Sequence, residues 1–194
     1  MGTPADPAAG IPATGAEAGA VPAGRPGVTM AVVMRRVALA SPWQPWKWEL
    51  DAVLPDLGEF GAVPHCLAQD EHGARWLYPG YGVTLFRDEA EGYYLNLTST
   101  APCWFVLWRM AEEGGQAAVP ASDNGEPLPL PVTVTLSYNE AGRWLDAGET
   151  VENVPLAPEQ LDWLRAYVAE HYRPEPKKRR RPESFKAPED RARY

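Results

Sequence analysis

The chain has 194 residues, a length that suits one hydrophobic core better than two. Residues 28–173 carry 9 Lys+Arg against 20 Asp+Glu, whereas residues 174–194 carry 8 against 4. Phosphate contacts need Lys and Arg on the binding face, so an acidic domain is a poor partner for nucleic acid. Composition therefore argues against a nucleic-acid-binding domain and leaves only the basic end for such a role.

The two ends of the chain differ in composition from its middle. Residues 1–27 are rich in Ala, Gly and Pro and lack the basic and apolar regions of a secretory signal, so we predict a disordered leader. No run of 18 apolar residues occurs in the chain, and we expect no membrane span and a cytoplasmic location. Residues 28–173 are predicted to form a single globular domain with a long loop at 111–131.

Residues 174–194 are predicted to be a disordered basic tail. The tail contains five consecutive cations: Lys177, Lys178, Arg179, Arg180 and Arg181. Like charges at this density repel one another and stay solvated. The run is either a solubilising end, which is the favoured interpretation, or an electrostatic contact with nucleic acid, an anionic membrane or an acidic protein.

Strand patterns begin at Val28, where the run VTMAVVMRRVAL is apolar and rich in β-branched residues. Residues 46–54, WKWELDAVL, alternate between apolar and charged positions, as in a half-buried strand. The apolar face of this second strand is predicted to hold Trp46, Trp48, Leu50 and Ala52.

Two hairpins are predicted next. Residues 70–73 are a turn signal between PHCLAQ and RWLY, and residues 89–92 separate GVTLFRD from YYLNLTS. Gly80 and Gly82 are predicted to form a bend between strands, because glycine supplies positive φ. Short strands at this spacing are typical of antiparallel sandwiches and barrels.

The run CWFVLWRM, residues 103–110, is apolar on both faces and is predicted to be a central strand. VTVTLS, residues 132–137, is predicted to be the final strand. Ser137 and Glu140 fit a capping box at the start of a short helix that ends at Gly148.

A second helix should begin at Pro158. Its apolar stripe is predicted to consist of Leu161, Leu164 and Val168, widened by Trp163 and Tyr167. The predicted fold is therefore α+β: a mainly antiparallel sheet or partly closed barrel of about seven or eight strands, a short helix and a C-terminal amphipathic helix.

No catalytic, metal or cofactor site is predicted. Cys66 and Cys103 are 37 residues apart and have no metal-ligand spacing. A disulfide between them is possible in principle, but free thiols are expected in a reducing compartment. His65 and Cys66, as neighbours on a strand, point to opposite faces and cannot act together.

Tryptophans and acidic residues are the remaining candidates. Four of the eight tryptophans lie at strand spacing, which is typical of a core: Trp46, Trp48, Trp104 and Trp108. Trp43 and Trp46 bracket the entrance of the second strand and should be partly exposed. Asp146, Glu149 and Glu152 form an acidic corner that is structural, a docking surface or catalytic, in that order of preference. Glu149 and Glu152 are predicted to be exposed on the link to the last helix.

Several motifs carry a family resemblance: the opening VVMRR strand, WxWELxAVLP from Trp46, SYNEA from Ser137, DAGETVENVPL from Asp146, and a helix ending in HYRPE. With these motifs, residues 28–181 resemble a proteobacterial family of unknown function (DUF3305-like) whose genes accompany those for molybdenum-dependent formate dehydrogenase. Some members are labelled as molybdopterin-guanine dinucleotide biosynthesis proteins. ALASPWQPW after Val37 is not the glycine-rich phosphate loop that such an enzyme needs.

The resemblance implies a non-enzymatic accessory protein that assists maturation, assembly or cofactor delivery of formate dehydrogenase. Its partners would be a subunit of that enzyme or one of its maturation factors. The predicted contact residues are Trp43, Trp46, Glu149, Glu152, Lys177, Lys178, Arg179, Arg180 and Arg181. Two alternatives are a small-ligand-binding barrel or enzyme with a tryptophan-lined pocket, and a nucleic-acid-binding regulator that uses the basic tail.

Overall fold

A computed structural model describes residues 26–41, 43–71, 73–111 and 127–174. The predicted leader up to residue 25, the basic run Lys177–Arg181 and most of the 111–131 loop lie outside the described residues. The strands are β1 (Gly27–Ala38), β2 (Trp46–Pro55), β3 (His65–Asp70), β4 (Gly73–Thr84), β5 (Cys103–Met110), β6 (Pro129–Thr135) and β7 (Thr150–Pro155). The helices are the 3-10 turn η1 (Arg87–Glu89), α1 (Ala90–Leu97), α2 (Tyr138–Asp146) and α3 (Pro158–His171).

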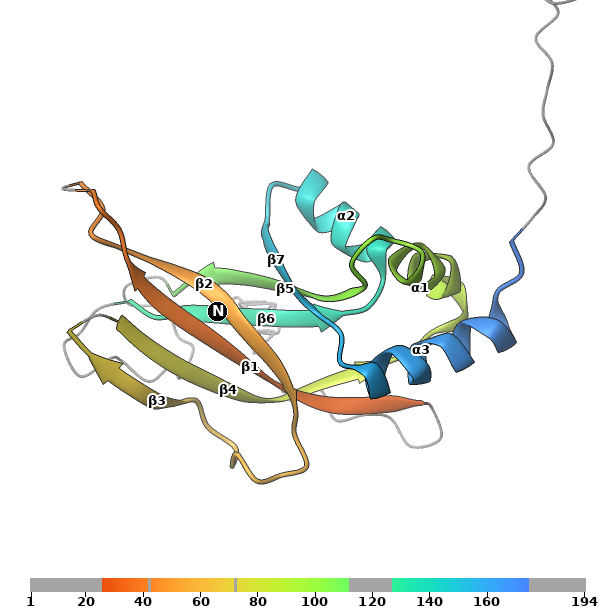
Figure 1. Ribbon diagram of the computed structural model, residues 1–194, viewed down its shortest axis with the longest axis horizontal. Coiled ribbons are helices and arrows are strands. Elements are labelled where there is room, and N and C mark those ends of the chain that lie inside the picture. Colours follow the sequence, from red (N-terminus) through yellow and green to blue (C-terminus); the bar gives the residue numbers. More distant parts are fainter. Residues whose placement is uncertain (1–25, 42, 72, 112–126, 175–194) are drawn as a thin grey trace, which may run out of the picture.

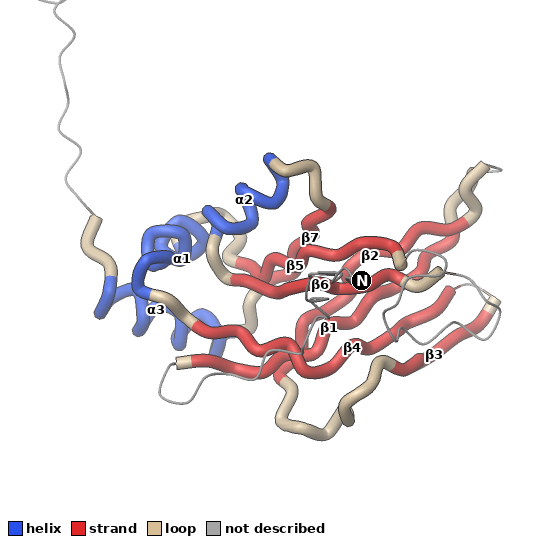
Figure 2. Tube along the Cα trace, turned by 180° about the vertical axis from the view of Figure 1, so that it is seen from behind, coloured by secondary structure: helices blue, strands red, loops and turns tan. Residues whose placement is uncertain are grey.

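The strands form two antiparallel sheets that pack against each other. Sheet A has the order β2-β1-β4-β3, and sheet B has the order β6-β5-β7. The helices gather at one end of the molecule, and the β1–β2 and β3–β4 hairpins point to the other end (Figures 1 and 2). The predicted α+β class with antiparallel sheets is confirmed; the two sheets stay separate and form no closed barrel.

One hydrophobic cluster joins both sheets to the helices. Its largest fully buried members include Trp104, Tyr78, Met30, Met34 and Leu164. The inward residues of β1 and β5 alternate as the sequence pattern requires, since successive side chains of a strand point to opposite faces. β5 is the central strand of sheet B, as predicted from its two apolar faces.

A bulge in β2 corrects the predicted face of Ala52. Met34 pairs with Leu50 and Val33 pairs with Ala52, so Asp51 is an extra residue on β2. The extra residue reverses the alternation. Leu50 therefore shares the core with Val53, whereas Ala52 packs on the opposite face of sheet A.

The predictions for residues 80–99 were wrong in two respects. The segment around Gly80 lies inside the single strand β4, where Gly80 has φ +88° beside a register shift, and so forms no bend between strands. The predicted strand YYLNLTS belongs mostly to α1. Tyr, Leu and Thr favour strands in isolation, but tertiary contacts outweigh that preference here.

Two α1 residues explain why this segment is helical. The Asn96 side chain is fully buried; its Nδ2 donates to the carbonyl oxygens of Cys103 and Leu136, and its Oδ1 accepts from the Cys103 N–H. Gly92 lets the helix approach Ser137 so closely that an added Cβ would lie 2.2 Å from the serine Oγ. Asn96 thereby joins α1 to the start of β5 and to the end of β6.

The capping signals of α2 are mostly confirmed. Ser137 Oγ accepts the Glu140 N–H at 3.1 Å, and Gly148 takes φ +81° after the helix. The N–H of Glu149 bonds to the Trp144 carbonyl, which completes a Schellman cap. The reciprocal half of the capping box is indirect: Glu140 accepts from the Thr135 hydroxyl, which in turn accepts the Ser137 N–H.

The link predicted before the last helix contains a seventh strand. β7 pairs antiparallel with β5, so VTVTLS is the penultimate strand and not the final one. α3 begins at Pro158 as predicted, with Leu164, Tyr167 and Val168 buried. Tyr167 meets Tyr93 of α1 edge to face, with ring centroids 5.9 Å apart.

Candidate functional site

The predicted aromatic contacts lie at the hairpin end of the molecule. The β1–β2 tip, residues 39–45, is closed by the Leu39 N–H on the Pro45 carbonyl and projects beyond both sheets (Figure 1). Pro42 within it lies outside the described residues. Trp43 on this tip is 95% exposed, whereas Trp46 is half-buried with the Arg36 guanidinium 4.8 Å above its ring. The hairpin thus presents one indole to solvent and keeps the other in a cation–π contact.

The two acidic candidates make bonds within the protein. Glu149 forms a bidentate ion pair with Arg109 of β5, and this hydrogen bond lowers the pKa of the Glu149 carboxyl. Glu152 lies in β7 and its Oε2 accepts the main-chain N–H of Leu50 at 2.5 Å. The predicted exposed link is therefore wrong for Glu152, whose carboxylate joins sheet B to the edge of sheet A. Binding of a partner by either residue stays a prediction.

None of the tryptophans in the described residues lines the hollow that lies at the β3–β4 hairpin. Trp76, Trp104 and Trp108 belong to the buried core cluster. The two cysteines are free: Cys66 is exposed on β3, and Cys103 is buried, which raises the pKa of its thiol. Among the described residues, no three side chains of His, Cys, Asp or Glu gather as a metal site would require.

A charged network covers part of the outer face of sheet A, which is the face turned away from sheet B. Arg35 of β1 contacts Glu49 of β2 at 2.5 Å, and Lys47 contacts the other oxygen of Glu49 at 2.7 Å. Asp51 lies between Arg35, at 3.6 Å, and Arg75 of β4, at 2.5 Å. The Lys47 hydrogen bond, with a further contribution from Arg35, holds the pKa of Glu49 below its ordinary value.

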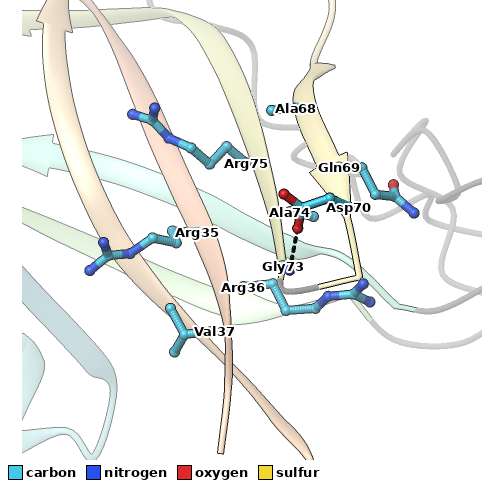
Figure 3. A pocket seen from close by; sticks show the side chains of 9 residues that line it. All are labelled: Arg35, Arg36, Val37, Ala68, Gln69, Asp70, Gly73, Ala74 and Arg75. Carbon is cyan, nitrogen blue, oxygen red and sulfur yellow. Dashed lines mark hydrogen bonds between the residues drawn. The ribbon is translucent and has the colours of Figure 1, made fainter.

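A hollow of about 240 Å³ opens beside this network at the β3–β4 hairpin (Figure 3). Its lining residues are Arg35, Arg36, Val37, Ala68, Gln69, Asp70, Gly73, Ala74 and Arg75. The small residues Gly73 and Ala68 leave space between the long side chains. Arg35 and Arg75 point to one side of the hollow and Arg36 points to the other, so the hollow is lined largely by aliphatic stems.

The sequence predicted the exposed tryptophan at the β1–β2 tip, but it did not predict the hollow at the β3–β4 hairpin. Of the nine cations of residues 28–173, three line the hollow, namely Arg35, Arg36 and Arg75, and Lys47 belongs to the charged network beside it. That concentration within an acidic domain was a usable signal. The pairing of β1 with both β2 and β4, which brings the four together, requires the strand register.

A second cluster of polar side chains joins η1 to α2. Glu89 accepts from the Ser137 hydroxyl at 2.5 Å and from Arg143 at 2.8 Å. Burial raises the pKa of the Glu89 carboxyl, but the bonds from Ser137 and Arg143 together hold it below its ordinary value. Ser137 is fully buried and also caps α2, so the cluster is a structural joint.

Residues 29–181 match the family model described as a protein of unknown function, DUF3305. The chain belongs to this family. Comparison with curated proteins and with solved structures gave no match. No helix in the described part of the chain is both long and apolar enough to cross a membrane. Family membership and the geometry at the hairpin end are therefore the findings from which a function has to be argued.

Proposed function

We propose that this DUF3305 protein is a non-enzymatic accessory protein that assists maturation, assembly or cofactor delivery of a molybdenum-dependent formate dehydrogenase. The link to that enzyme rests on the resemblance carried by the WxWELxAVLP, SYNEA and DAGETVENVPL motifs. A subunit of the enzyme or one of its maturation factors is the proposed partner.

The observation that supports a binding role is the exposure of Trp43. An indole that is 95% exposed at the end of a closed hairpin has no stabilising contact to lose when a partner covers it. Tryptophan is among the residues that dominate binding energy at protein interfaces.

The test begins with deletion of the gene in its host, followed by measurement of formate dehydrogenase activity and molybdenum content. A tagged copy of the wild-type protein should restore both and should co-purify with an enzyme subunit or maturation factor. Trp43→Ala should fold normally and lose the co-purifying partner. The matched control is Leu57→Ala, because Leu57 is 91% exposed but follows the other end of β2.

Full activity and molybdenum content in the deletion strain, with no partner recovered on the tagged protein, would contradict the accessory role. Retention of the partner by Trp43→Ala and loss by Leu57→Ala would place the contact elsewhere on the molecule. The basic tail, whose Lys177–Arg181 run lies outside the described residues, is tested separately by deletion of residues 175–194.

A further inference from the structure

The β1–β2 hairpin ends in an uncharged run that lies on the surface. Residues 37–46, VALASPWQPW, contain no Asp, Glu, Lys or Arg, in a chain of which 23% of the residues are charged. Exposed segments without charge mark places where a protein contacts an apolar surface of another molecule or of a membrane. The exposed residues of this run are Ala38, Ala40, Trp43, Gln44 and Pro45.

The main chain of the tip has few hydrogen-bond donors that need water. Pro42 and Pro45 have no N–H, and the Leu39 N–H donates to the Pro45 carbonyl at 2.7 Å. The Gln44 N–H donates to Ser41 Oγ in a longer bond of 3.4 Å. Of the seven main-chain nitrogens of the tip, two therefore have no hydrogen and two are bonded. Because an unpaired N–H is costly to move out of water, this tip leaves water at a lower cost than an ordinary loop.

The position of the tip lets it reach a surface ahead of the rest of the protein. It projects beyond both sheets and lies apart from the β3–β4 hairpin, which carries Asp70 and Glu71 (Figures 1 and 2). The first charged residues behind the tip are cations on both strands, Arg36 on β1 and Lys47 on β2. The nearest carboxylate along β2, Glu49, pairs with Lys47 at 2.7 Å. An acidic domain can therefore present this tip while its carboxylates remain in water.

We infer that the β1–β2 tip inserts Trp43 into the interface of a lipid bilayer. Tryptophan prefers the boundary between headgroups and acyl chains, because its ring is apolar and its indole N–H can donate a hydrogen bond. The inference assigns binding to burial of the indole and not to the cations, since Arg36 lies over the Trp46 ring and Lys47 is paired with Glu49. It goes beyond the proposed function, because it needs neither formate dehydrogenase nor a protein partner.

Two features of the tip favour a lipid surface as its occupant. A pocket on a protein can pair with the charged side chains and main-chain N–H groups of a loop, so it does not require either to be missing. A bilayer cannot pair with them, and it requires both to be scarce. The tip meets this stricter requirement. A segment that can enter a bilayer can also occupy an apolar pocket, so Trp43 remains the proposed contact of the accessory role.

The test is flotation of the full chain with phosphatidylcholine vesicles in about 0.5 M salt. Uncharged lipid and high salt suppress binding through the basic tail, which would need anionic lipid. One indole buries less apolar surface than a myristoyl chain, which binds membranes at about 10⁴ M⁻¹, so the wild type should float at lipid concentrations on the order of 1 mM or above. Trp43→Ala should bind about tenfold more weakly, and Leu57→Ala, which removes another exposed side chain, should bind like the wild type.

Two matched substitutions test whether the tip enters an apolar medium. Gln44→Glu adds a carboxylate to the exposed tip, and Gln69→Glu adds one to an exposed position of β3. Because a charge is costly inside a bilayer, Gln44→Glu should weaken vesicle binding at least about fivefold, whereas Gln69→Glu should leave it unchanged. Both variants should keep the wild-type circular dichroism and melting temperature, since both side chains are exposed.

Vesicles with bromine on the acyl chains report whether Trp43 is inserted. Bromine quenches nearby tryptophan, so the wild type should lose more fluorescence on these vesicles than Trp43→Ala does. The inference is overturned if the wild type does not float, if Trp43→Ala or Gln44→Glu floats as well as the wild type, or if Leu57→Ala loses as much binding as Trp43→Ala. Absence of vesicle binding, together with loss of the co-purifying protein by Trp43→Ala, would remove the lipid contact and leave the accessory role in place.

Discussion

Replacement of Glu152 should measurably loosen the contact between the two sheets. Its Oε2 accepts the N–H of Leu50, a residue that is only 8% exposed, at 2.5 Å. A hydrogen bond to a charged acceptor contributes about 1.5 to 3 kcal/mol, and a buried donor left unpaired costs a similar amount. Glu152→Ala should therefore lower the free energy of unfolding by about 1.5 to 3 kcal/mol, or Tm by about 4 to 10 °C.

Urea unfolding, followed by tryptophan fluorescence and circular dichroism, measures this loss. Glu152→Gln keeps an acceptor oxygen and loses the charge, so it should fall between the wild type and Glu152→Ala. Glu149→Ala is the control, because its exposed pair with Arg109 exchanges contacts with water and should matter less. A Glu152→Ala loss below about 0.5 kcal/mol, or a larger loss in Glu149→Ala, would show that Glu152 does not join the sheets.

Three further predictions concern the helices. Asn96→Ala should lower the free energy of unfolding by about 3 to 5 kcal/mol, since it leaves three buried main-chain groups unpaired. A loss of less than about 1 kcal/mol in urea unfolding would contradict this prediction. Gly92→Ala should lower the free energy of unfolding by about 1 to 3 kcal/mol, because the added Cβ would meet Ser137. Gly142→Ala has open space around its Cβ and should raise the free energy of unfolding by up to about 1 kcal/mol. Thermal melts that shift in the same direction for both variants would refute the packing argument. The pKa of Glu89 is lowered on folding, so its contribution to stability is present above the ordinary value of 4.5 and is lost as pH falls through the lower folded value. Glu89→Gln should therefore flatten the acid limb of the stability curve, and an unchanged slope between wild type and variant below pH 4.5 would exclude this role.

Local signals predicted the elements whose partners lie nearby in the sequence. β1 was predicted from its apolar, β-branched run, β2 from its period-two alternation and β5 from a run that is apolar on both faces. Ser137 and Gly148 bounded α2 because caps are formed by the residues next to the helix. Pro158 located α3 for the same reason.

The mistaken elements depend on distant contacts. YYLNLTS has strand-forming residues, and only the pairing of Asn96 with Cys103 and Leu136 shows why it is helical. β7 has half-exposed and exposed positions along its whole length, so its pattern looked like a link. β7 is a strand because β5 lies in the middle of sheet B and pairs with a neighbouring strand along each of its two edges.

The residues of the candidate site also divide into those that local sequence could predict and those that depend on distant contacts. Exposure of Trp43 follows from its place between two prolines at a strand end, and the sequence was sufficient to predict it. The contact between Glu152 and Leu50, by contrast, crosses 102 residues and depends on how two sheets pack. The grouping of Arg35 with Arg75 likewise depends on the register of β1 against β4.

Each sheet is made from one uninterrupted stretch of chain, since β1 to β4 all precede residue 85 and β5 to β7 all follow residue 102. Their inward faces nevertheless share one hydrophobic cluster, so neither half can bury its apolar surface alone. A cut between Leu85 and Arg87 would divide the molecule into two polypeptides, one with sheet A and one with sheet B and every helix. The two polypeptides should fold only when they bind each other. The DUF3305 fold is therefore suited to be a split protein, in which refolding of the two halves reports that two proteins fused to them are close together.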